Sequence, residues 1–140
     1  MHKNYMKMQL PSLPCNREVI SGAVSVFAEQ LNPTVEELNE ICTIVYEAVD
    51  NCVNFAYPDD IGPICVTCKI LNNNVLNIII KDKGVGIVDI EKAMQPLFST
   101  GGSMRSGLGL TVIDAYSTKC SVLSVPGKGT TVNIKKQINK

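Results

Sequence analysis

A carboxylate and a carboxamide stand four residues apart in this chain, at Glu47 and Asn51. Apolar residues recur around them at helical spacing, so both side chains are expected on one face of a helix. The apolar positions are Leu38, Ile41, Val45, Ala48, Val49 and Cys52. Such a polar pair suits a divalent cation and a hydroxyl group that must lose a proton. Taken alone, it is more simply interpreted as the solvated face of an amphipathic helix, because short motifs have high false-positive rates.

A second carboxylate, Asp82, follows a strand-like apolar run and precedes Gly84 and Gly86. It could accept a hydrogen bond from an exocyclic amine, which is how an adenine ring is recognised in a narrow pocket. Its simpler role is to cap the turn. A dinucleotide-binding fingerprint is not supported, because the third glycine is replaced by Asp89 and no parallel βαβ context surrounds it.

Two further glycine pairs lie downstream. Gly107 and Gly109 precede a predicted helix, whose N-terminal amides would favour phosphate. Gly127 and Gly129 flank Lys128, and because Gly129 directly follows the lysine, the Ser or Thr that a P-loop requires at that position is missing. For this last pair, considered alone, a simple turn is the better interpretation.

The bulk composition indicates a globular chain with no strong charge bias. It has 140 residues, 45% apolar content, and 13 acidic against 13 basic side chains. This length predicts one domain over residues 1–140, and the near-zero net charge does not favour a nucleic-acid partner. No apolar run reaches the roughly 18 residues of a membrane helix, and no secretion signal is visible, so a cytoplasmic location without membrane contact is expected.

The six cysteines are expected to be reduced thiols of the core, because they sit within apolar patterns. Cys65 and Cys68 have the spacing of half a zinc site. They lie in a strand-like run, however, where an odd spacing sends two side chains to opposite faces. The second pair of ligands is also missing, so the pattern weighs against zinc.

Periodicity and turn residues predict strands and helices in the order β-α-α-β-β-α-loop-α-β-β. The expected strands are 5–10, 64–71, 75–81, 119–125 and 130–138, and the expected helices are 17–31, 34–56, 89–94 and 110–116. The second helix has a capping box at Thr34 and Glu37. The first helix is expected to bury Val19, Ile20, Ala23, Val24, Phe27 and Leu31. This order predicts an α/β (α+β) two-layer sandwich, a mostly antiparallel sheet with helices on one face.

The motifs taken together resemble the GHKL ATP-binding family, which includes DNA gyrase and the histidine kinases. They are, in order, Glu47-x-x-x-Asn51, Asp82-x-Gly84-x-Gly86, Gly107-x-Gly109 and Gly127-x-Gly129-Thr130-Thr131. Longer runs are similar to the anti-sigma F branch of that family, small cytosolic serine kinases of spore-forming bacteria. These runs are Gln30-Leu31-Asn32-Pro33-Thr34, Gln95-Pro96-Leu97-Phe98 and Arg105-Ser106-Gly107-Leu108-Gly109. The resemblance covers nearly the whole chain.

The resemblance implies a Bergerat ATP-binding fold and gives several residues a role toward ATP or ADP. Asn51 would hold the Mg²⁺ that bridges the phosphates, and Glu47 would be the general base. Asp82 would bind the adenine amino group, with Thr130 nearby. The same resemblance assigns further nucleotide contacts to Gly84, Gly86, Arg105, Ser106, Gly107, Leu108 and Gly109. Residues 97–106 would form a lid over the nucleotide.

The resemblance also implies protein partners. A homodimer with ATP bound would sequester a sigma factor, and a serine of an anti-anti-sigma factor would accept the phosphoryl group. Ser21 stands where the branch typically carries a partner-contacting arginine, and Arg17, one turn earlier, is the candidate to take its place. Asp50 is expected to add negative charge beside the metal site.

Two alternatives stay open. One is a related kinase that serves a stress-type sigma factor, which Ser21 favours. The other is a nucleotide-gated binding module without phosphoryl transfer, against which the carboxylate of Glu47 counts.

Overall fold

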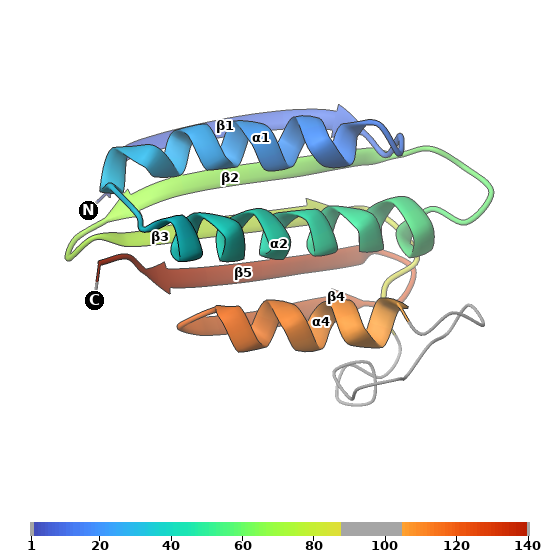
Figure 1. Cartoon of the computed structure of the whole chain (residues 1–140). Helices are drawn as coiled ribbons and strands as arrows, with labels where there is room; N and C mark the ends of the chain where they lie inside the picture. Colours follow the sequence, from blue (N-terminus) through green and yellow to red (C-terminus); the bar gives the residue numbers. More distant parts are fainter. Residues whose placement is uncertain (1, 88–104, 140) are drawn as a thin grey trace.

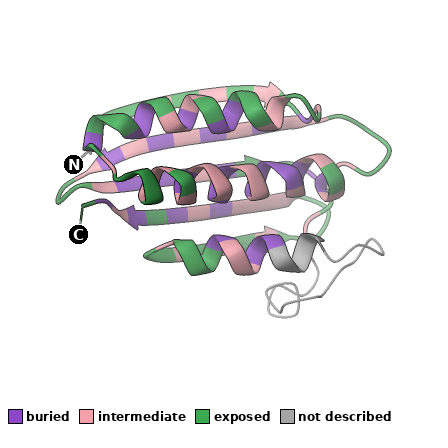
Figure 2. Cartoon of the chain, in the orientation of Figure 1, coloured by how far each residue is buried: buried purple, intermediate pink, exposed green. Residues whose placement is uncertain are grey.

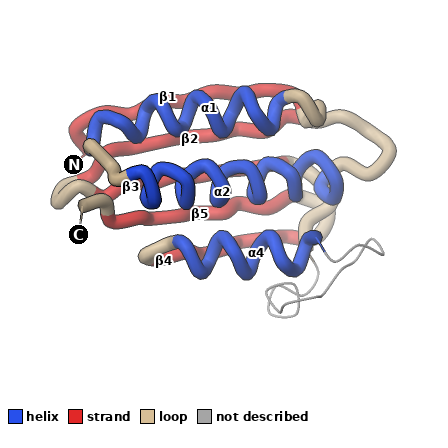
Figure 3. The backbone as a smooth tube through the Cα atoms, in the orientation of Figure 1, coloured by secondary structure: helices blue, strands red, loops and turns tan. Residues whose placement is uncertain are grey.

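The computed structural model describes residues 2–87 and 105–139, with side chains for residues 4–87 and 109–139. Figure 1 shows one sheet with three long helices side by side on one of its faces. The helices are α1 (Asn16–Ala28), α2 (Val35–Asn51) and α4 (Arg105–Tyr116), and the strands are β1 (His2–Pro11), β2 (Pro63–Leu71), β3 (Val75–Asp82), β4 (Lys119–Val125) and β5 (Gly129–Gln137). The predicted two-layer sandwich is confirmed, as the tube in Figure 3 makes plain.

The five strands pair in the order β1-β2-β3-β5-β4, and every neighbouring pair is antiparallel. The β2–β3 hairpin turns at 72–74, where Asn73 and Asn74 adopt positive φ, as asparagine tolerates. Strand β1 is an edge, as predicted. In β2 the burial alternates strictly, so half-buried Cys65 and buried Cys68 face opposite sides. The geometry therefore opposes a shared metal, as the spacing predicts.

The core lies between the helices and the inner face of the sheet, where the purple segments of Figure 2 meet. Its largest fully buried side chains are Ile20, Ile41, Ile44, Ile64, Leu76, Ile78, Ile80, Ile113, Ile134 and Ile138. Val19 is an exception to prediction: it is 52% exposed on the outer side of α1. Its neighbour Ile20 already fills the core position on that turn. Of the six free thiols, Cys52 and Cys68 are buried and Cys15 is exposed, so the core prediction fails for Cys15.

Helix α2 begins as the sequence predicts. The Thr34 hydroxyl accepts from the Glu37 backbone N–H at 3.0 Å, and the Glu37 carboxylate accepts from the Thr34 N–H at 2.9 Å. This capping box satisfies two otherwise orphaned donors and is worth about 1 kcal/mol. The helix ends differently: the α-helix stops at Asn51 and continues as a π-helical turn, η2 (Cys52–Ala56). Single π turns of this kind are frequent at functional sites.

Other boundaries also differ from prediction, including those of β1, which covers His2–Pro11 in place of 5–10. The first helix ends at Ala28, and its last turn is a 3₁₀ helix, η1 (Glu29–Leu31). Helix α4 begins at Arg105 and not at 110, so its first turn includes Gly107. Strand β5 covers Gly129–Gln137 in place of 130–138. The predicted helix at 89–94 and most of the predicted lid, 97–104, lie outside the described residues. Within the described residues, no helix is both long and apolar enough to cross a membrane.

Candidate functional site

Asp82 is the last residue of β3 and is buried, with 7% of its surface exposed. Its Oδ1 accepts hydrogen bonds from the Gly84 N–H at 2.9 Å and from the Thr130 N–H at 3.2 Å. The first bond caps the turn that leaves β3, and the second joins that turn to the start of β5. The structure therefore brings Asp82, Gly84 and Thr130 together, although Thr130 is 48 positions away in the chain.

The turn after Asp82 packs tightly against the end of η2. The Val85 N–H donates to the Ala56 carbonyl at 2.8 Å, and a Cβ on Gly84 would collide with that same carbonyl oxygen. Gly86 has φ +79°, a conformation that L side chains rarely adopt, and it lies against the Val125 carbonyl. Close backbone neighbours thus require glycine at both positions. The turn, which would line the predicted adenine pocket, lies beside η2.

Glu47 and Asn51 converge on one residue of α4. A Cβ on Gly109 would lie 3.0 Å from Glu47 Oε2 and 3.4 Å from Asn51 Oδ1, so a larger residue here would displace these side chains. Both polar side chains are half-buried. The first turn of α4, residues 105–108, carries the backbone N–H groups that a helix leaves unpaired. The structure thus brings together Glu47, Asn51 and the positive end of a helix dipole.

The donor set at this point fits a magnesium ion that is held mainly by phosphates. A carboxylate and an amide oxygen are hard ligands, and Mg²⁺ usually takes only one or two ligands from protein. Within the described residues there is no cluster of three or more His, Cys, Asp or Glu side chains that would form an all-protein cage. Asn51 therefore fits the predicted role as a single amide ligand, and Glu47 lies next to it.

Asp50 does not lie beside this cluster, and the prediction that it adds charge to the metal site is wrong. Its side chain is 2% exposed and forms an ion pair with Arg17 Nη1 at 2.6 Å. The Asn54 amide donates to the same carboxylate oxygen at 2.9 Å. Asp50 thus faces α1, because successive residues of a helix point about 100° apart. Asn54 belongs to this second group and does not extend the face of Glu47 and Asn51.

Arg17 is held in place by contacts within the chain, and its predicted contact with a partner protein stays a prediction. Its hydrogen bond to Asp50 raises the pKa of the guanidinium, and its Nε donates to the Pro14 carbonyl at 3.1 Å. The guanidinium carbon also lies 5.6 Å from the centre of the Tyr46 ring. Ser21 is buried, and its hydroxyl donates to the Cys42 carbonyl at 3.2 Å. Residues 17 and 21 thus join α1 to α2 in this chain.

Two residues near Asp82 were not singled out from the sequence. Tyr57 Oη donates to the Pro63 carbonyl at 2.6 Å and accepts from the Lys83 N–H at 2.7 Å, and burial raises the pKa of this phenol. Cys52 Sγ lies 3.5 Å from Asp82 Oδ2. The available signal for Cys52 was its position directly after Asn51. Because Cys52 also fits the apolar stripe of α2, the sequence offers no reason to expect its contact with Asp82.

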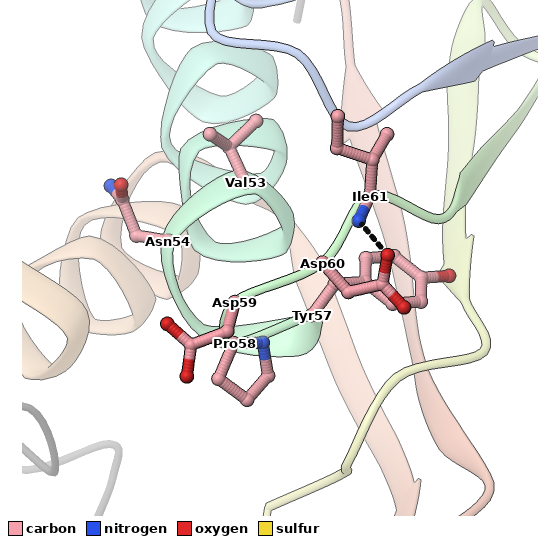
Figure 4. A pocket seen from close by; sticks show the side chains of 7 residues that line it. All are labelled: Val53, Asn54, Tyr57, Pro58, Asp59, Asp60 and Ile61. Carbon is pink, nitrogen blue, oxygen red and sulfur yellow. Dashed lines mark hydrogen bonds between the residues drawn. The ribbon is translucent and has the colours of Figure 1, made fainter.

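The cavity of about 520 Å³ shown in Figure 4 lies elsewhere, at the loop that follows η2. It is lined by Val53, Asn54, Tyr57, Pro58, Asp59, Asp60 and Ile61. None of these is a predicted site residue. Asp60 uses Oδ1 to accept from the Ile61 N–H at 2.8 Å, which orders the loop itself. Asp82 and Asn51 therefore do not line this cavity.

Side chains are not described for Arg105, Ser106 and Leu108, and Gly107 is described as backbone only. All four lie in the first turn of α4. Their predicted contacts with phosphates stay predictions.

Comparison with known proteins agrees with this arrangement. Residues 11–136 match the family model described as the histidine kinase-like ATPase domain. An anti-sigma F factor from Caldanaerobacter subterraneus is 42% identical over 140 residues, covering 99% of this chain and 97% of that protein. An anti-sigma F factor from a Geobacillus species is 40% identical over 139 residues, covering 99% and 95%.

Solved structures share the fold at low sequence identity. The RsbU and RsbW domains of a Mycobacterium tuberculosis protein superpose with a TM-score of 0.69 at 13% identity, covering 97% of this chain and 33% of that one. A mycobacterial sensor histidine kinase, MprB, gives a TM-score of 0.56 at 16% identity, covering 94% and 97%. At such identities the likeness shows a common fold alone.

Proposed function

The chain belongs to the histidine kinase-like ATPase domain family and, within it, to the anti-sigma F factors, and from this premise we propose that it is an anti-sigma factor and an ATP-dependent protein serine kinase. Its nucleotide would lie between Asp82 and the first turn of α4. The observation that carries the proposal is the close approach of Gly109 to Glu47 and Asn51, which leaves a carboxylate and an amide facing a helix N-terminus.

Asp82 would recognise the base of the nucleotide by a hydrogen bond. Its carboxylate is held by the Gly84 and Thr130 backbone N–H groups and can accept from the 6-amino group of adenine. Gly84 and Gly86 would shape the wall of that pocket. Recognition of an amine by a buried acceptor discriminates strongly, because a 6-oxo purine would leave the acceptor unpaired.

The phosphates would lie toward α4. The unpaired N–H groups of residues 105–108 and the helix dipole favour anions there, and Arg105 would meet the γ-phosphate. Asn51 would be the protein ligand of Mg²⁺, which supplies charge neutralisation on the phosphates when it is bound. Positioning and charge neutralisation are the main requirements of phosphoryl transfer.

Glu47 would act as the general base. It accepts the proton of the acceptor serine hydroxyl while the new bond forms between the serine oxygen and the γ-phosphorus. The bond between that phosphorus and the β-phosphate oxygen breaks, and ADP leaves. The position of Glu47 one helical turn from Asn51 supports this role, because the two side chains lie on the same face of α2.

The partners would be a sporulation-type sigma factor and its serine-bearing antagonist, the anti-anti-sigma factor. A homodimer with ATP bound would hold the sigma factor in the cytoplasm, and unphosphorylated antagonist would release it. Phosphorylation of the antagonist would then end the release. The names and near-full-length coverage of the anti-sigma F relatives support this assignment.

Phosphoryl transfer is tested by incubating the protein with Mg-ATP and a candidate antagonist, followed by intact-mass measurement of the antagonist. We expect one added phosphoryl group on a serine, and its loss with Glu47→Gln while ATP still binds. Glu36→Gln is the matched control, because Glu36 is an exposed carboxylate in the first turn of the same helix. An unmodified antagonist despite tight ATP binding would leave a nucleotide-gated binding module and end the kinase proposal.

Sigma-factor sequestration is tested separately by co-purification of sporulation-type and stress-type sigma factors in ATP and in ADP. We expect retention of the sporulation-type factor, and more of it in ATP. Retention of the stress-type factor alone would change the partner assignment, and retention of neither would remove the anti-sigma proposal.

A further inference from the structure

The two carboxylate oxygens of Asp82 face different donors. Oδ1 accepts from two backbone N–H groups, those of Gly84 and Thr130. Oδ2 faces Cys52 Sγ at 3.5 Å, and both side chains are buried, with 4% of Cys52 and 7% of Asp82 exposed. The donor to Oδ2 therefore comes from the π-helical turn that directly follows Asn51.

The chemistry of this contact fixes its direction. A carboxylate oxygen has no hydrogen to donate, so the Cys52 thiol donates S–H and Asp82 Oδ2 accepts. A thiol can donate one hydrogen bond, whereas a carboxylate oxygen has two lone pairs. Among the contacts of the described residues, one acceptor site on Oδ2 is left for a ligand.

Resting on the nucleotide site proposed above, we propose that Cys52 is a positioning residue for base recognition: its thiol fixes the rotation of the Asp82 carboxylate so that Oδ2 presents its second lone pair to the 6-amino group of the purine. Without the thiol, two backbone N–H groups still hold Oδ1, but Oδ2 is no longer oriented by the hydrogen bond from Cys52. The preference for a 6-amino purine then weakens, while the binding of the phosphates is unchanged.

A second buried cysteine shows what a purely space-filling thiol looks like in this chain. Cys68 of β2 is fully buried, and burial alone raises its pKa to about 12. Cys52 differs because its hydrogen-bond partner is the carboxylate at the base of the pocket. Cys68 is therefore the matched control for removing a buried thiol.

The experiment compares ATP with purine riboside triphosphate, which lacks the 6-amino group, on the full chain by calorimetry with Mg²⁺. The wild-type protein should prefer ATP. Cys52→Ala should shrink that preference by about three- to tenfold, since one guided hydrogen bond is lost, and Cys52→Ser should restore it by supplying an O–H donor. Cys68→Ala should leave the preference unchanged, whatever it does to the melting temperature.

The outcomes separate this inference from the nucleotide site itself. If Cys52→Ala weakens both nucleotides equally, the residue is only structural and the inference is overturned. If the wild-type protein prefers ATP and both Cys52 variants keep the full preference, the inference is also overturned but the nucleotide site stands. If the wild-type protein binds neither nucleotide, the proposed function has failed. Cys52→Val, which also lacks a donor but fills the space, decides the test if the alanine variant does not fold.

Discussion

The two sides of α2 near its C-terminal end are built from neighbouring polar residues, yet they differ in what covers them. Toward α1, Asp50 is closed in by an arginine and an asparagine and is 2% exposed. Toward α4, Glu47 and Asn51 are half-buried and face a glycine. Adjacent residues of α2 thus differ in their burial and in the residues that surround them.

The difference teaches how a site is kept available for a ligand. A buried carboxylate costs several kcal/mol of desolvation unless it is paired, so Asp50 requires Arg17. On the other side, Gly109 packs directly against a carboxylate and an amide. Asp50 stabilises the fold through its ion pair, whereas we propose that Glu47 and Asn51 serve the nucleotide.

The largest loss of stability is expected from removing Arg17, on the side of α2 that faces α1. Arg17→Ala leaves the buried Asp50 carboxylate without its ion-pair partner, and should cost about 3 kcal/mol of unfolding free energy, the lower end of the range for a broken buried pair. Urea denaturation measures this loss. ATP affinity of the folded fraction should change less than about threefold, because Arg17 bonds to Pro14 and Asp50 on the side of α2 that faces α1. A loss of ATP affinity larger than the loss of stability would contradict the separation of the two sides.

On the side of α2 that faces α4, replacing Gly109 is expected to change stability less but to slow phosphoryl transfer clearly. Gly109→Ala places a methyl group 3.0 Å from Glu47 Oε2, which must move away. Alanine also favours the helix over glycine by about 1 kcal/mol, so the melting temperature should change little. Phosphoryl transfer should fall about tenfold or more, because displaced reacting groups lose the attack geometry. Single-turnover transfer with the antagonist measures this, with Gly22→Ala, at an open position on α1, as the control. Unchanged transfer would show that Gly109 does not shape the catalytic space.

The smallest effect is expected at the opposite end of α2, far from both sides. Burial by itself would raise the pKa of Glu37, but hydrogen bonds from the Thr34 and Asn139 backbone N–H groups lower it overall from 4.5. Because the pKa of Glu37 is lower in the folded state than in the unfolded state, its ionisation stabilises the fold at pH values above the unfolded-state pKa. This stabilisation is lost as the pH falls through the folded-state pKa. Glu37→Gln should therefore cost about 0.5 kcal/mol at pH 7 and nothing at the acid end of the transition. Thermal unfolding from pH 7 to pH 3 measures it, and a constant difference would contradict the assignment.

What the sequence predicts well is local. The capping box of α2, the antiparallel hairpin at 72–74 and the opposite facing of Cys65 and Cys68 depend on residues within a few positions of each other, and the structure confirms all three. The two-layer arrangement also follows from the order of elements.

What it predicts poorly depends on distant partners. Gly107 and Gly109 disfavour a helix, and yet α4 begins at Arg105, because packing against α2 overrides propensity. Asp50 was placed with Asn51, and its true direction depends on Arg17, which lies 33 positions away. The contact of Cys52 with Asp82 likewise joins residues 30 positions apart. No local pattern carries these pairings.

The central claim is a Mg²⁺-dependent ATP site built on Asp82 and Asn51, and calorimetric titration with ATP tests it most directly. Asp82→Asn keeps the shape of the side chain and the oxygen that accepts from Gly84 and Thr130, but replaces the acceptor facing the base with an N–H donor. We expect binding by the wild-type protein that needs Mg²⁺ and weakens about tenfold or more with Asp82→Asn and with Asn51→Ala. It should be unchanged with Asp114→Asn, an exposed carboxylate on α4. Absence of binding at millimolar ATP, or binding indifferent to both site variants, would contradict the account.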